Sequence, residues 1–150
     1  ALPLEEKLLL PLREWGSKFD FEHVDQVHFI HVIKVNITPL EFGLIESPDD
    51  TTYREMVPTL KKFLEDESKK ILPANFKGKV TYQIEKDSDP EEEAIDILKN
   101  EHPEFIVVSS HARHGLDSFL HSSFTDYMIK HAPCDVFVVR PHGQEFRQSA

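Results

Sequence analysis

The sequence predicts an α/β domain in which a mostly parallel sheet carries helices on both faces, a doubly wound arrangement. The main observation is that β-branched apolar runs alternate along the chain with segments of helical periodicity. A second observation is that some of these runs are apolar throughout, as strands buried on both faces are. With 150 residues, the chain fits one domain. We expect that domain to span residues 1–141, followed by a loose tail over 142–150.

The strands are predicted from short runs bounded by turn residues. Residues 27–35 and 105–108 are rich in Val, Ile and Phe and should lie inside the sheet. Residues 80–85 alternate in character, which favours a position near the sheet edge. A last short strand is expected over Val136–Val139. The stretch from 36 to 50 reads as a loop.

The helices are predicted from apolar positions at helical spacing. A first helix covers residues 4–18, where Pro11 should kink it or stop it early. A second covers 51–71, where Pro58 should kink or split it. Its inward face is predicted to comprise Tyr53, Met56, Leu60, Phe63, Leu64 and Ile71.

Two further helices lie in the second half of the chain. Asp89 followed by Pro90 is a strong start signal, because Asp can cap a helix and Pro suits its first position. The buried stripe of this helix is expected to be Ala94, Ile97 and Leu98. The other helix is predicted over residues 123–131.

Composition excludes several classes of partner. Acidic residues outnumber Lys and Arg by 27 to 17, for a net charge of −10, so a nucleic acid is not an expected partner. No apolar stretch is long enough to span a membrane. Cys134 is the one cysteine, which predicts a structural thiol, no internal disulfide and a cytoplasmic location.

In a doubly wound sheet, ligands bind outside the carboxyl ends of the strands, where strand order reverses. The loop after Val108 is such a place. From Glu104 the chain reads EFIVVSSHARHGLDSFLHSSFTDYMIKHAPCDVFVVRP, which resembles the closing segment of universal stress proteins. That family has the adenine nucleotide alpha hydrolase-like fold. The resemblance extends to DPEEEAIDILKNEHPEFIVVSS and VHFIHVIK and so covers nearly all of the chain.

Nucleotide-binding members of that family carry a glycine, two residues, a second glycine, nine residues, and then glycine followed by Ser or Thr. The matching positions here are Ser109, Ala112, Ser122 and Ser123. All glycines are therefore replaced. Positive φ angles would be strained in the replacements, which would weaken a phosphate cradle. The competing interpretation is a small-residue loop kept for close packing.

The resemblance implies further ligand contacts. Val32 would touch the adenine, although a plain core role explains it as well. Arg113 and Phe124 complete the expected nucleotide contacts, and ATP or AMP is the expected ligand. His111 and His114 flank Arg113, but no Cys or carboxylate stands convincingly beside them, so no metal site is predicted.

The resemblance also implies a central strand that this sequence lacks, since the chain opens on the helix that should follow it. We therefore expect an upstream segment to fill the gap between the strand at Val27 and the strand at Phe105. Direct pairing of these two strands would rule this out.

The function implied is stress-linked binding or signalling rather than catalysis, with weak binding of ATP or AMP at loop 109–123. The alternative is a slow ATP hydrolase that uses the same loop. A phosphoacceptor receiver domain is a weaker rival, because the acidic residues it needs at strand ends are not seen. The resemblance further implies a homodimer through the last strand, Val136–Val139.

Overall fold

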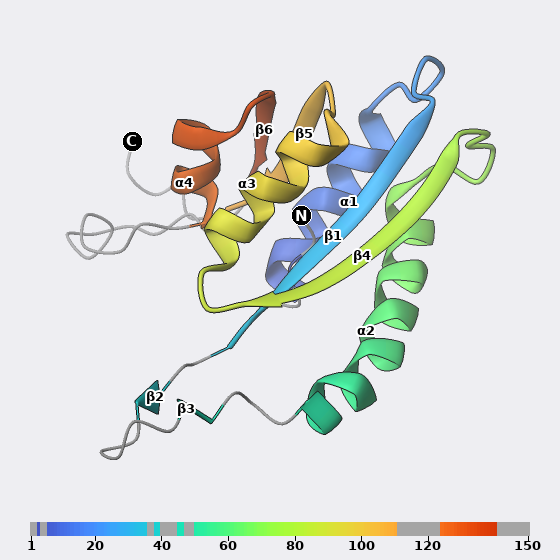
Figure 1. Ribbon diagram of the computed structural model, residues 1–150. Coiled ribbons are helices and arrows are strands. Elements are labelled where there is room, and N and C mark those ends of the chain that lie inside the picture. Colours follow the sequence, from blue (N-terminus) through green and yellow to red (C-terminus); the bar gives the residue numbers. More distant parts are fainter. Residues whose placement is uncertain are drawn as a thin grey trace, which may run out of the picture.

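The computed structural model describes residues 3, 6–35, 38–39, 45–46, 50–110 and 124–140, and the statements below concern these residues. The tail over 142–150 lies outside them. The elements in chain order (Figure 1) are α1 (Glu6–Lys18), β1 (Gln26–Lys34), β2 (Thr38–Pro39), β3 (Ile45–Glu46), α2 (Asp50–Ile71), β4 (Lys79–Asp87), α3 (Pro90–Glu101), β5 (Phe105–Ser109), α4 (Phe124–His131) and β6 (Asp135–Val139).

The main strands form two parallel pairs. β1 pairs with β4 along its whole length, from Gln26 opposite Lys79 to Lys34 opposite Asp87. β5 pairs in parallel with β6 along its whole length. Within the described ranges, no strand pairing joins β1 to β5. The gap expected between these strands is therefore present.

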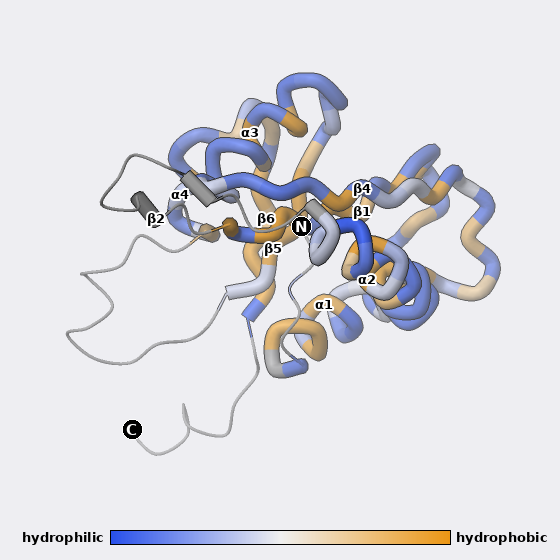
Figure 2. Tube along the Cα trace, turned by 60° about the horizontal axis from the view of Figure 1, so that its bottom comes forward, coloured by the Kyte–Doolittle hydropathy of each residue, from blue (hydrophilic) through white to orange (hydrophobic). Residues whose placement is uncertain are grey.

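Helices cover both faces of the strands, which confirms the α/β architecture. Figure 2 shows α1 and α2 on one side of the largely apolar strands and α3 on the other. Each side has its own buried cluster. One, which we call the α3-side core, comprises Ile30, Ala94, Ile95, Ile97, Leu98, Ile106, Val108 and Met128. The other, the α1-side core, comprises Leu9, Leu12, Phe29, Leu64 and Ile71.

The stretch predicted as a loop over residues 36–50 contains two short strands. Thr38–Pro39 and Ile45–Glu46 form a short antiparallel ladder, β2 with β3. Two-residue strands fall below what a sequence pattern can reveal, because no alternation of side chains develops over that length.

Both prolines lie inside continuous helices. α1 runs through Pro11 to Lys18, so the expected early stop was wrong. α2 runs unbroken through Pro58, so the expected split was also wrong. Pro58 leaves the carbonyl of Arg54 without its helical donor. Both residues are exposed, so water can serve that carbonyl and the helix continues.

The inward face of α2 differs from its prediction in part. Leu64 and Ile71 are buried as expected, but Met56 is 42% exposed. Glu67 and Ser68 are buried instead. Ser68 shares a hydrogen bond with the Tyr82 hydroxyl at 2.8 Å, which satisfies it in the core.

The burial of Glu67 depends on α1. The Arg13 guanidinium donates to both carboxylate oxygens of Glu67 at 2.8–2.9 Å through Nη2, and Lys70 adds an ion pair at 2.6 Å. Nearby, Gly16 lies against α2 so closely that a Cβ would come within 2.9 Å of the backbone carbon of Ile71. These contacts fix how the two helices approach each other.

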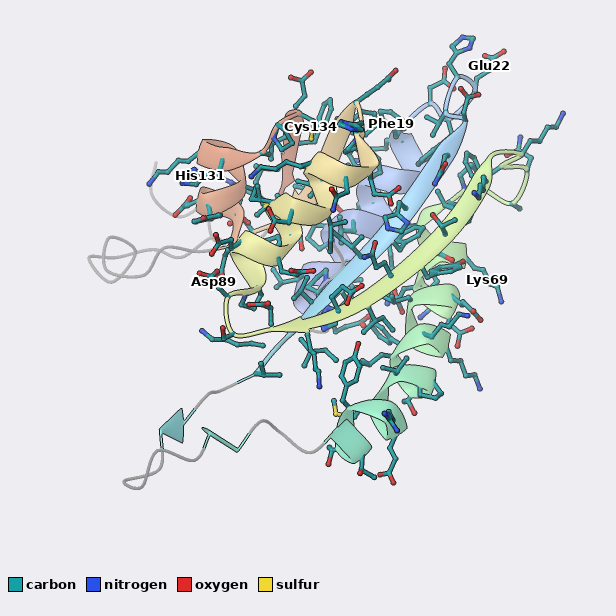
Figure 3. All side chains as sticks on the ribbon, viewed as in Figure 1. Phe19, Glu22, Lys69, Asp89, His131 and Cys134 are labelled. Carbon is teal, nitrogen blue, oxygen red and sulfur yellow. The ribbon has the colours of Figure 1, made fainter. Side chains whose placement is uncertain are left out.

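The start of α3 matches its prediction. The Asp89 side chain accepts from the backbone N–H of Glu92 at 3.1 Å, and Pro90 occupies the first turn. The predicted buried stripe is confirmed, with Ile95 added to it. Asp89, labelled in Figure 3, thus places the first turn of α3 at the carboxyl end of β4.

Aromatic rings form a row near the amino ends of the strands. The ring of Phe137 in β6 contacts the ring of Phe105 in β5 edge-on, with their centroids 5.1 Å apart. The centroids of the Phe105 and Phe19 rings are 5.8 Å apart. The ring centroids of Phe19 and Phe21 lie 4.9 Å apart, and those of Phe21 and Phe76 lie 5.8 Å apart. We call these five residues the aromatic row. It reaches from β6 to the turn before β4.

Candidate functional site

The order of the strands defines where a ligand would bind. From β1 the chain steps through α2 to β4, away from β5, while from β5 it steps through α4 to β6. α2 packs on β4, and α4 packs on α3, so the two crossovers lie on opposite faces. The direction therefore reverses between β1 and β5, and the crevice outside their carboxyl ends is the expected ligand position.

Ser109 lies at that position, at the carboxyl end of β5. Its hydroxyl oxygen is buried and has no hydrogen-bond partner among the described residues. Its carbonyl accepts from the Thr125 hydroxyl at 3.3 Å, so the first turn of α4 lies against it. Leaving a buried hydroxyl unpaired costs about 1–3 kcal/mol. A bound group that accepted or donated here would recover part of that cost.

Val32 and Phe124 lie close to the same region. Both are half-buried and pack against the α3-side core, which includes Val108 next to Ser109. Val32 precedes the end of β1 by two residues, and Phe124 opens α4. Val32 and Phe124 therefore both pack against the cluster that contains Val108, which agrees with the core role of Val32. Contact of Val32 and Phe124 with a nucleotide stays a prediction.

The other predicted nucleotide contacts lie outside the described residues. These are Ala112, Arg113, Ser122 and Ser123, together with the histidines at 111 and 114. Their grouping into a phosphate cradle stays a prediction.

Charge is unevenly distributed along the carboxyl ends of the strands. Burial, together with the nearby carboxylates Asp87, Glu85 and Asp96, raises the pKa of Glu93 in the first turn of α3. A phosphate group would be repelled from the β4 end of the crevice. The positive end of the α4 dipole, beside Ser109, favours an anion instead.

A contact that the sequence did not reveal links α2 to the end of β4. The Lys86 ammonium lies 4.7 Å from the centre of the Tyr53 ring. The Tyr53 hydroxyl donates to the carbonyl of Ile84 at 3.2 Å. Burial and the charge of Glu85 raise the pKa of Tyr53. The contact holds the start of α2 against β4, on the far side of β1 from Ser109.

Cys134 and His28 have structural surroundings. Cys134 is half-buried against the α3-side core, and burial, then the charge of Asp135, raises the pKa of its thiol. A raised pKa disfavours the reactive thiolate. His28 lies between Thr81, at 2.6 Å from Nδ1, and Gln83, at 2.9 Å from Nε2. In Figure 3, Cys134 and Asp89 lie at opposite ends of the molecule.

Two findings about metal ions and membranes apply to the described parts of the chain. No group of three or more His, Cys, Asp or Glu side chains there could hold a metal ion. None of the helices described there is both long enough and apolar enough to cross a membrane.

Comparison with known proteins assigns the family. The model of the universal stress protein family matches residues 16–140. The chain belongs to the universal stress protein family. A search of curated proteins finds no match to this universal stress protein.

Solved structures agree with the fold of this universal stress protein. It is similar to the hypothetical protein MJ0577, the subject of a structure-based assignment of biochemical function, with 22% identity and a TM-score of 0.63 over 91% of this chain and 90% of that one. It is also similar to a universal stress protein family protein from Arabidopsis thaliana with AMP bound. That likeness has 18% identity and a TM-score of 0.52 over 93% of this chain and 82% of the other.

Proposed function

We propose that this universal stress protein is a stress-response binding or signalling module that binds an adenine nucleotide weakly in the crevice beside Ser109. The observation that carries the proposal is the buried hydroxyl of Ser109, which has no hydrogen-bond partner among the described residues and lies where the strand order reverses. The AMP bound to the Arabidopsis protein supports the ligand class. The lone cysteine and the net charge of −10 support a cytoplasmic location.

Weak rather than tight binding follows from the residues at the glycine positions. Ser109, Ala112 and Ser122 carry a Cβ where the family's nucleotide-binding members have none. Ser109 does not adopt a positive φ in the structure, whereas a loop that needed a positive φ at Ala112 or Ser122 would be strained by about 1 kcal/mol or more per residue. The loop therefore loses affinity for phosphate oxygens, while the α4 dipole still attracts them.

Thermal denaturation during titration with AMP and ATP tests the proposal. Ligand at a hundred times its Kd should stabilise the protein by about 2.7 kcal/mol. Ser109→Ala should weaken the shift, whereas Ser17→Ala, a change on the exposed face of α1, should leave it unchanged. No shift at roughly millimolar nucleotide, or the same shift in Ser109→Ala, would count against the crevice.

We propose that the module does not turn its nucleotide over. The rival is a slow ATP hydrolase that uses loop 109–123. Phosphate release from ATP separates the two functions: a non-catalytic module gives none above the protein-free rate. Turnover that disappears in Ser123→Ala would establish the hydrolase in its place.

We also propose a homodimer through Val136–Val139. In the described part of the chain, β6 pairs only with β5, and Phe137 on β6 is 45% exposed. An unprotected strand edge next to an exposed ring invites pairing with a second copy. Sedimentation velocity should give the mass of a dimer at high micromolar protein, and a monomer at that concentration would refute it.

A further inference from the structure

A nine-residue strand edge lies along the outside of β4. β4 runs from Lys79 to Asp87 and, within the described ranges, pairs only with β1. Figure 1 shows β4 as the outer strand of this pair, and α2 packs beside it. A strand edge of this length invites pairing with another chain unless a contact blocks it.

The hydrogen bonds at the two ends of β4 show which backbone groups form this edge. The N–H of Lys79 donates to the carbonyl of Asp25, so Lys79 faces β1. The carbonyl of Asp87 accepts from the N–H of Val35, so Asp87 faces β1 as well. In a parallel ladder, alternate residues direct both of their backbone groups to the same side. The residues between them that direct these groups outward therefore include Val80, Tyr82 and Ile84.

One of these outward carbonyls already has a partner. The hydroxyl of Tyr53, in the first turn of α2, donates to the carbonyl of Ile84 at 3.2 Å. The Lys86 ammonium lies 4.7 Å from the centre of the Tyr53 ring, which helps to hold the ring at the edge. A strand added along β4 would need the Ile84 carbonyl as an acceptor, so it would have to displace the Tyr53 hydroxyl.

The sequence of β4 is complementary in charge to itself. It reads KVTYQIEKD, with Lys79 at its first position and Asp87 at its last. Two copies paired antiparallel around Gln83 would place Lys79 of each copy opposite Asp87 of the other. The same register uses the whole strand and places Tyr82 opposite Ile84, so outward-facing residues meet as hydrogen-bonded pairs. Opposite charges directly across such a ladder stabilise it, and like charges destabilise it.

We propose that the outer edge of β4 is a pairing edge for a second copy of this chain, antiparallel and centred on Gln83, and that the Tyr53 hydroxyl closes it. Movement of the first turn of α2 away from β4 would open the edge. This inference is independent of nucleotide binding and of the proposed dimer through β6, because it uses neither the crevice beside Ser109 nor Val136–Val139.

Sedimentation velocity of Tyr53→Phe and Tyr53→Ala, with the native protein at the same concentration as reference, tests the proposal. Both variants lose the hydroxyl that closes the edge, so the weight-average mass should rise about twofold or more above that of the native protein. Amide hydrogen exchange at Val80, Tyr82 and Ile84 should slow by about tenfold or more in the associated form. Tyr82→Phe is the matched control, because it loses a hydrogen bond to Ser68 instead and should keep the native mass.

A charge substitution at the end of β4 tests the register. In the Tyr53→Phe background, Lys79→Glu would place two carboxylates opposite each other at both ends of the ladder and should weaken association by about tenfold or more. Lys62→Glu makes the same change of net charge at an exposed position of α2 and should not weaken it. Native mass in both Tyr53 variants would overturn the proposal, as would association without slower exchange at the three β4 amides. Equal effects of Lys79→Glu and Lys62→Glu would overturn the register centred on Gln83.

Discussion

Removal of Arg13 should destabilise the protein far more than its position on the first helix suggests. The Glu67 side chain is 3% exposed. Arg13→Met removes one of its ion pairs and leaves the ion pair with Lys70. Arg13 itself is only 20% exposed, so its own charge is partly desolvated. We expect a loss of about 2–3 kcal/mol in the free energy of unfolding.

The magnitude follows from the geometry. Unit charges 2.8 Å apart, the Nη2–Oε2 distance, attract by about 6 kcal/mol at an effective dielectric constant of about 20. Desolvation of the charges offsets part of this attraction, and breaking a buried pair typically costs about 3–5 kcal/mol. Because Lys70 still pairs with Glu67, we expect a loss of stability at or below the lower limit of that range. For this chain length, the melting temperature should fall by about 4–12 °C.

Urea denaturation followed by circular dichroism measures the effect. The matched control is Glu6→Gln, which removes the other carboxylate bound by Arg13. This carboxylate is 68% exposed, so its loss should cost far less than the loss of Arg13. A cycle with Glu67→Leu and the double variant should show a coupling of about 1–3 kcal/mol. If Arg13→Met costs no more than Glu6→Gln, the buried pair does not stabilise the contact between α1 and α2.

Three other predictions concern α1 and α3. Gly-to-Ala substitutions within a helix normally stabilise it by about 1 kcal/mol. Gly16→Ala should instead destabilise the protein by about 1–3 kcal/mol in urea denaturation, because Gly16 lies so close to α2. The control Ser17→Ala, on the exposed side, should be nearly neutral, and a stabilising Gly16→Ala would contradict the packing. Asp89→Ala should lower the free energy of unfolding by about 1 kcal/mol through loss of the helix cap. Ser88→Ala, at the exposed neighbouring position, should have no such effect. Equal effects of the two substitutions would exclude a capping role. The raised pKa of Glu93 means that the folded state favours its protonated form, so Glu93→Gln should stabilise the protein at neutral pH. This advantage should shrink as the pH falls through the raised pKa and be gone below the ordinary value of 4.5. A constant advantage from neutral pH to below 4.5 would refute the assignment.

Local signals predicted most of the elements correctly. The cap and proline at Asp89 and Pro90 act within a few residues of themselves, so the start of α3 could be predicted from the sequence. The alternating pattern of residues 80–85 likewise matched a strand at the edge of its pair, because β4 has one partner in the described ranges.

The misses arose where distant residues decide the outcome. A glutamate on a helix is expected to face water, but Glu67 is buried because Arg13, 54 residues away in the chain, pairs with it. Met56 was expected inside, yet its side chain is 42% exposed. Pro58 was expected to kink or split the helix, and α2 is not split there, because the residue is exposed, which the sequence does not report.

The candidate site was predictable in position but not in detail. The apolar run ending at Val108 predicted a ligand position in the loop after this strand, and in the structure Ser109 ends β5. Its contact with a ligand stays a prediction. No sequence pattern reports that its hydroxyl is buried without a hydrogen-bond partner among the described residues. The contact of Lys86 with Tyr53 was not predicted either, because the two residues are 33 positions apart in the sequence and no local pattern reports their contact.

The aromatic row has a consequence for how the molecule unfolds. Ladder hydrogen bonds hold each strand pair together, and no strand pairing joins one pair to the other within the described structure. Cooperative melting of the whole domain must then be transmitted by side chains, and the rings of Phe105, Phe19 and Phe21 form a continuous route between the halves. Weak transmission along that route would let each half open as a separate foldon.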